Sequence, residues 1–220
     1  MTSSTKLTLA EELVLIALDD ESGSLLSLPP FSLEVAMAAS LLMELELAGR
    51  IDSDEQKLFV ISPKPTGNAI LDEPLEEIVA EGRQLPTSAW LRRLASPGPV
   101  LRERVIAGLV DRGVLQSVEK RLLWVFKTRV YPPTSGIEER EVKSRIMTLL
   151  NNDEIPDTRD ALLVGLLRAT GIMSRLLSST ERDRLRDRID QIANLEEINR
   201  ALSATISELL IELTSASFHP

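Results

Sequence analysis

Apolar residues recur at helical spacing through most of the 220-residue chain. The first such segment, residues 9–18, follows Thr8, and Glu11 three positions later completes the pattern of a capping box. A second helix is predicted from Ser32 to Gly49, because glycine is common just after a helix C-terminus. Further helices are predicted over residues 71–80, 87–94, 101–110, 137–150, 157–177, 180–192 and 195–213. The segment 157–177 is almost continuously apolar, so we expect this helix to be central.

Two short segments are typical of β-hairpins. In the first, Ile51 and the apolar run 58–61 flank a polar turn. The second hairpin is predicted over residues 114–126, and its tip is expected at Glu119, Lys120 and Arg121. The two faces of its second strand would both be apolar, with Leu122, Trp124 and Phe126 on one face and Leu123 and Val125 on the other. Such a hairpin needs a partner, which is the core, a second protomer or lipid.

The two predicted hairpins belong to a weak internal repeat. Residues 41–61 align with residues 105–125, and Gly49 falls on Gly113, so each copy is a helix, a glycine and a hairpin. This order resembles a winged helix, which leaves a DNA-binding regulator as an alternative function. The helix of the first copy offers Glu44, Glu46 and a lone Arg50, whereas a helix that reads a DNA groove needs basic and amide side chains. Nucleic acid is therefore not the favoured partner.

Charge along the chain is uneven. Residues 83–129 contain ten Lys and Arg and three acids, although the whole chain has a formal net charge of −9. The segment just before it, residues 65–82, contains five acids and no base. A concentrated basic segment predicts contact with an anionic surface, and the alternative is that these arginines pair with nearby acids.

The sequence contains little material for catalysis. There is no cysteine, the one histidine is His219, and the glycines are spread singly, which excludes thiolate sites, histidine cages and phosphate-binding glycine loops. Carboxylate clusters such as residues 19–21 are explained by helix ends and turns. We expect neither an enzyme nor a cofactor nor a metal site. The chain start lacks a signal-peptide pattern and residues 161–177 are interrupted by two arginines, so a cytoplasmic protein with at most peripheral membrane contact is predicted.

Six segments in order resemble the Golgi phosphoprotein 3 family. They are LTLAEELVLIALDDESG at residues 7–23, LMELELAGRI at 42–51, PTGNAILDE at 65–73, WLRRL at 90–94, LRERVIAGLVDRGVL at 101–115 and DTRDALLVGLL at 157–167. The resemblance implies one all-α, mainly helical domain, with a central helical bundle and one or two β-hairpins, over residues 7–214. Flexible ends would occupy residues 1–6 and 215–220.

The resemblance also implies a function. Eukaryotic members of the family bind phosphatidylinositol 4-phosphate on Golgi membranes and act as adaptors for the cytoplasmic tails of membrane proteins, and their hairpin helps self-association. Of four family positions that bind the headgroup, Arg102 matches, and this sequence has Pro29, Ala38 and Pro99 at the other three.

We therefore expect a non-enzymatic peripheral adaptor that binds anionic phospholipid, with a homo-oligomer and cytoplasmic tails as further partners. The expected headgroup-binding residues are Arg102, Arg92, Arg93 and Arg121, and the expected oligomer or membrane contacts of the hairpin are Leu122, Leu123, Trp124 and Phe126. A scaffolding protein that binds no lipid is the other alternative.

Overall fold

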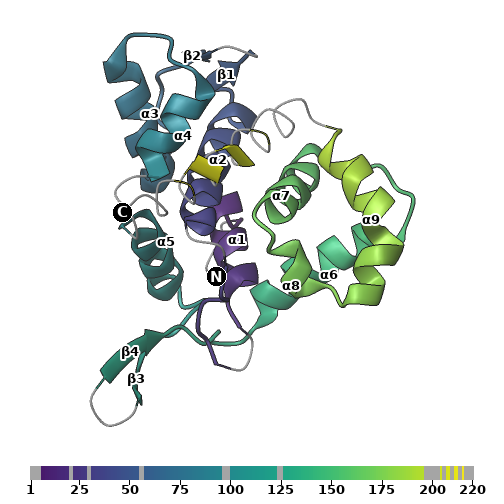
Figure 1. The fold of residues 1–220 in the computed structure, drawn as a ribbon. Helices are drawn as coiled ribbons and strands as arrows, with labels where there is room; N and C mark the ends of the chain where they lie inside the picture. Colours follow the sequence, from purple (N-terminus) through teal and green to yellow (C-terminus); the bar gives the residue numbers. More distant parts are fainter. Residues whose placement is uncertain are drawn as a thin grey trace.

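The computed structural model has two helices at its centre and groups of helices on either side of them (Figure 1). It describes residues 6–19, 22–28, 31–54, 57–95, 100–122 and 126–195, together with residues 204, 207, 208, 211, 212 and 215. Helices α1 (Leu9–Ala17) and α2 (Ser32–Leu47) form the centre. On one side lie α3 (Ala69–Glu81), α4 (Thr87–Ala95) and α5 (Val100–Asp111), and on the other lie α6 (Ile137–Asn151), α7 (Thr158–Ala169), α8 (Met173–Leu176) and α9 (Ser179–Ala193).

Helix α1 is the most completely enclosed element, because all nine of its residues are buried. The predicted capping box is confirmed: Thr8 N donates to Oε2 of Glu11 across 2.8 Å, and Glu11 N donates to Oγ1 of Thr8 across 3.2 Å. Helix α2 buries 13 of its 16 residues and packs against α3, α4, α5 and α7. The centre of the fold is therefore formed by α1 and α2, and not by the segment 157–177 as predicted.

The predicted helix over 157–177 is two helices. Helix α7 ends at Ala169, Gly171 adopts the left-handed conformation with φ +76°, and α8 follows as a single turn. A glycine in this conformation ends a helix at little steric cost, which the apolar pattern alone does not reveal. Residues 160–167 are nevertheless buried, since α7 packs between the central helices and α9.

Each predicted hairpin is a two-stranded antiparallel sheet. Strands β1 (Ile51–Ser53) and β2 (Leu58–Val60) form the first, and β3 (Val118–Leu122) and β4 (Phe126–Val130) form the second. The predicted tip at Glu119, Lys120 and Arg121 is wrong, because these residues lie within β3 and pair with Arg129, Thr128 and Lys127. Leu122 and Phe126 are the last register partners, so the two strands are joined by residues 123–125. The predicted contacts Leu123 and Trp124 are among these residues and lie outside the described part of the chain.

The fold class is confirmed: the described part of the chain is mainly helical, with two small antiparallel sheets. The repeat of helix, glycine and hairpin is confirmed as well, with φ +62° at Gly49 and φ +72° at Gly113. Most of the predicted helix over 195–213 lies outside the described residues. Within the described ranges, no helix has the length and apolar character needed to cross a bilayer.

Candidate functional site

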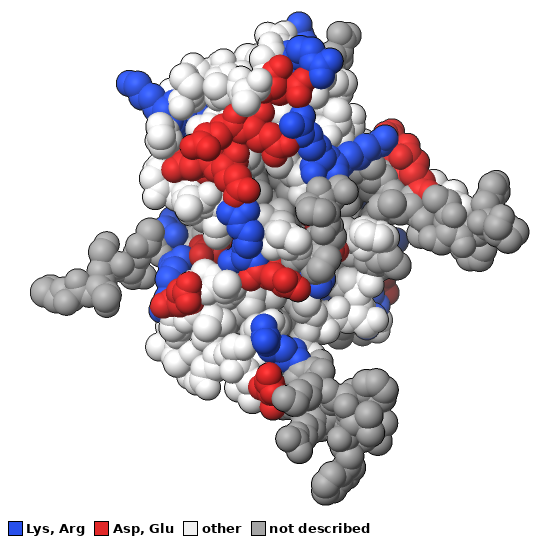
Figure 2. All heavy atoms as spheres, turned by 90° about the vertical axis from the view of Figure 1, so that its left-hand side faces the viewer, with Lys and Arg blue, Asp and Glu red and all other residues white. Residues whose placement is uncertain are grey.

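Three arginines of the basic segment, residues 83–129, pair with acids of helix α3. Arg83 Nε donates to Oε1 of Glu81 across 2.6 Å, and Arg104 forms an ion pair with Glu73. The face of the molecule shown in Figure 2 accordingly has red acidic side chains between the blue basic ones. The alternative interpretation of the charge pattern, in which arginines pair with neighbouring acids, therefore holds for α4 and α5.

The two arginines of α4 that were expected at the headgroup site each have protein partners. Arg92 contacts Glu212, with Nη2 3.0 Å from Oε1. Arg93 bonds Glu77 and Glu81, and its guanidinium carbon lies 5.0 Å from the centre of the Trp90 ring. The hydrogen bond from Arg93, followed by that from Arg83, lowers the pKa of Glu81. A lipid headgroup would have to compete with these carboxylates, and headgroup binding by Arg92 and Arg93 stays a prediction.

Arg102 lies on α5 beside the first turn of α2. Its Nη1 donates to Oε1 of Glu34 across 2.6 Å, and 26% of its side chain is exposed. Ala38, one turn further along α2, is completely buried. Its methyl group cannot contact a headgroup at the surface, so of the two family positions within the described residues solvent reaches only Arg102. Pro29 and Pro99 lie outside the described residues.

The β3–β4 hairpin carries four of the ten cations of the basic segment, at residues 120, 121, 127 and 129. Its register places Arg121 directly opposite Lys127, two positions along the strands from the register partners Glu119 and Arg129. The hairpin extends away from the helices (Figure 1), and its strands make at most slight contact with them. Like charges directly opposite each other destabilise a strand pair. Four basic residues are thus gathered on an element whose strands make at most slight contact with the helices.

A buried group of charges was missed by the sequence reasoning. Glu12 of α1, only 2% exposed, accepts a hydrogen bond of 3.0 Å from Nη2 of Arg145, and Nε of Arg145 donates to Asp160 across 2.7 Å. Arg159 lies 3.7 Å from the other oxygen of Glu12 and donates to Oε1 of Glu44 across 2.7 Å. Burial raises the pKa of Glu12, although both arginines act in the opposite direction. The signal in the sequence was the pair of acids at 11 and 12 inside an otherwise apolar helix.

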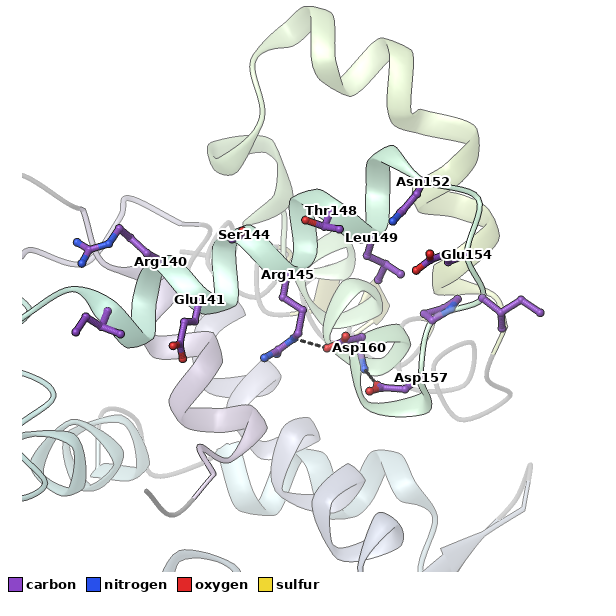
Figure 3. A pocket seen from close by; sticks show the side chains of 13 residues that line it. Arg140, Glu141, Ser144, Arg145, Thr148, Leu149, Asn152, Glu154, Asp157 and Asp160 are labelled. Atoms are coloured by element: carbon purple, nitrogen blue, oxygen red, sulfur yellow. Dashed lines mark hydrogen bonds and ion pairs between the residues drawn. The ribbon is translucent and has the colours of Figure 1, made fainter. Parts of the chain in front are cut away.

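A cavity of about 620 Å³ lies beside this group, between α6 and the start of α7. Figure 3 shows Arg145 directed from α6 toward Asp160, whereas Arg140 lies at the far end of the same helix. Asp157 is engaged as the N-cap of α7, where its Oδ1 accepts from Asp160 N across 2.7 Å. Arg145 and Asp160, which line this cavity, therefore join α6 to α7, and Arg145 also joins α6 to Glu12 of α1.

The fold also bears on the winged-helix alternative. In the first copy of the repeat the helix before the hairpin is α2, which is buried on nearly all sides and leaves no face for a DNA groove. In the second copy the exposed residues of α5 include Glu103 and Asp111 as well as Arg104. Neither helix presents the basic face that groove binding requires.

Comparison of the sequence with models of known protein families identifies the family of this chain. The model of the Golgi phosphoprotein 3 (GPP34) family matches residues 9–209. The chain belongs to this family. That match includes all the named helices and both hairpins, so the resemblance drawn from six segments is confirmed over the whole fold.

Two curated proteins show how this member of the Golgi phosphoprotein 3 family compares with others. Vacuolar protein sorting-associated protein 74 of Eremothecium gossypii is 30% identical in an alignment of 165 residues that covers 66% of this chain and 49% of that protein. The protein of the same name from Schizosaccharomyces pombe is 25% identical over 239 residues, covering 97% of this chain and 68% of that protein. The chain thus spans between about half and two thirds of the length of these relatives.

Proposed function

We propose that this member of the Golgi phosphoprotein 3 family is a non-enzymatic peripheral membrane adaptor that binds anionic phospholipid surfaces through its β3–β4 hairpin. The observation that carries the proposal is the register of Arg121 against Lys127 on an element that extends from the body. The repulsion between two opposed cations is relieved when an anionic surface lies against them.

Sequence and register together add an apolar part to this surface. Leu122 and Phe126 form the last pair of the register, and the residues between them in sequence are Leu123, Trp124 and Val125. Basic residues followed by large apolar ones suit the boundary between headgroups and acyl chains. The same residues are the ones through which we propose self-association, and bivalent attachment would strengthen a weak single contact.

The helix arginines have a secondary place in this proposal. Arg92, Arg93 and Arg102 are held by carboxylates, so each must exchange an ion pair for a headgroup contact. Each basic residue near an anionic membrane contributes on the order of 1 kcal/mol. The four hairpin cations would therefore give weak, salt-sensitive attachment, and binding of cytoplasmic tails would occur on a protein already at the membrane.

Sedimentation with liposomes tests the proposal. We expect binding to anionic but not to zwitterionic liposomes, and we expect it to weaken as salt rises from about 50 to about 300 mM, because the Debye length falls below about 10 Å. The double variant Arg121→Gln/Lys127→Gln should lower the partition coefficient roughly 30-fold, which corresponds to about 1 kcal/mol for each residue.

The matched control is Arg83→Gln/Arg104→Gln, which removes the same charge from two arginines that pair with acids of α3 and are not predicted headgroup ligands. We expect the control to bind within about threefold of the parent chain, since paired surface charges contribute little. Equal sedimentation with neutral and anionic liposomes, or equal losses in the two double variants, would contradict the proposal.

A further inference from the structure

A second basic surface lies away from the hairpin, in a groove between α8 and the first half of α9. The groove has a volume of about 470 Å³, and the last turn of α7 also contributes to it. Its polar lining includes Arg168, Arg182 and Arg186 and the hydroxyl groups of Ser174 and Ser179.

Arg182 is unusual among the arginines of this protein. Among those whose side chains the structure describes, only Arg129 and Arg182 have a guanidinium group that donates no hydrogen bond to, and forms no ion pair with, a described residue. Arg182 is exposed, and its five N–H donors are free for a ligand.

The neighbouring arginines are only partly engaged. Arg186 lies one helical turn beyond Arg182 on the same face, and one of its nitrogens bonds Asp183 across 3.0 Å in a well-exposed pair. Arg168 uses Nε to bond Asp190 across 2.6 Å. Two cations four residues apart repel each other along a helix, so a helix that carries Arg182 and Arg186 is stabilised when an anion lies between them.

The geometry points to an oxyanion site in this groove, which binds a phosphomonoester or a pyrophosphate group. The planar guanidinium of Arg182 would hold two phosphate oxygens, Arg186 would contact a third, and the hydroxyl of Ser179 would donate to the same group. Asp183 and Asp190 line the groove too, where they accept hydrogen bonds from Arg186 and Arg168, so Arg182 is the principal cation offered to an anion. The phosphate group can belong to a lipid headgroup or to a soluble compound.

Isothermal titration of the full chain with inorganic pyrophosphate at low salt tests the site. We expect saturable binding with one site per chain, and Arg182→Gln should weaken it about tenfold or more through the loss of charged hydrogen bonds. Arg186→Gln should weaken it by a smaller factor. Arg184→Gln is the matched control, because Arg184 leaves the same helix toward Asn151, does not line the groove and should change binding less than about twofold.

Vesicles distinguish the two sources of the phosphate group. If Arg182→Gln also lowers binding to phosphatidic acid vesicles relative to phosphatidylglycerol vesicles of equal charge, the natural ligand is a lipid headgroup. If it affects pyrophosphate alone, the ligand is soluble. Absence of saturable pyrophosphate binding, or equal weakening by Arg182→Gln and Arg184→Gln, would overturn the site. The hairpin variant Arg121→Gln/Lys127→Gln should bind pyrophosphate like the parent chain, so this test and that of membrane attachment fail separately.

Discussion

Arg102 on α5 and Glu34 on α2 form an ion pair in which Nη1 lies 2.6 Å from Oε1. The pair joins two helices that are 68 residues apart in sequence at this contact. It also holds the arginine that matches the family's headgroup site against an acid of the same protein. Whether Arg102 contributes to membrane binding therefore depends on whether lipid can displace Glu34.

Releasing Arg102 should strengthen membrane binding. In Glu34→Gln the arginine loses its charged partner, and we expect the partition coefficient on anionic liposomes to rise roughly fivefold. This factor corresponds to about 1 kcal/mol, the contribution of one basic residue at the membrane surface. The control Glu73→Gln removes the same charge and leaves Arg104, which lies on α5 like Arg102, without its ion-pair partner. Equal increases in both variants would mean that total charge, and not the position of Arg102, decides binding.

Selectivity for phosphatidylinositol 4-phosphate should be poor. Ala38 is buried, and Pro29 and Pro99 supply no donor, whereas each charged hydrogen bond to a headgroup is worth roughly 1.5 to 3 kcal/mol. We expect less than about a tenfold preference for this lipid over other anionic lipids in liposomes of matched surface charge. A larger preference would show that other residues form a specific pocket.

Gly23 should tolerate no side chain. Its φ is +66°, a Cβ atom there would lie 2.6 Å from the backbone nitrogen of Pro132, and its carbonyl accepts a hydrogen bond from Tyr131. We expect Gly23→Ala to lower the free energy of unfolding by about 2 kcal/mol or more in denaturant titrations. Gly113 has a similar φ, but a Cβ atom there would meet open space. Gly113→Ala should therefore lower the free energy of unfolding by only about 1 kcal/mol. Equal losses would show that the contact with Pro132 relaxes.

The buried Glu12 predicts an unusual pH dependence. Burial raises its pKa above the ordinary value of 4.5, so its contribution to stability is present below pH 4.5 and is lost as the pH rises through the folded-state pKa. Glu12→Gln resembles the protonated form, and its stability relative to the parent chain should therefore improve as the pH rises from about 4 to about 7. Arg145, Arg159 and Asp160 are the charged groups that face Glu12. A relative stability that falls over this range would show that the two arginines outweigh burial.

Shortening the hairpin should separate assembly from folding. Val118 and Val130 are register partners, so an Asn-Gly turn can replace residues 119–129. Because the strands barely contact the helices, the free energy of unfolding should change by no more than about 1 kcal/mol in circular dichroism melts. Light scattering should show a monomer if the hairpin is the self-association surface. Loss of the melting transition would instead assign the hairpin to the core.

The sequence alone determined the local structure. Thr8 and Glu11 defined the start of α1, Gly49 and Gly113 marked the ends of α2 and α5, and the order of segments identified the family, because caps, glycines and apolar spacing act within a few residues. The same local rules misplaced the tip of the second hairpin, since a strand of alternating character fixes which residues share a face but not where the chain reverses.

Only the tertiary structure decided which charges are available to a partner. Charge counting gave equal weight to Arg93, Arg102 and Arg121, yet α3 and α2 supply carboxylates to the first two from residues far away in sequence. An arginine's strength as an anion site depends on the acids within a few ångströms, and packing brings those acids from other elements. The fold thus pairs Arg93 and Arg102 with carboxylates and leaves the side chains of Arg129, on the hairpin, and Arg182, on α9, without an acceptor among the described residues.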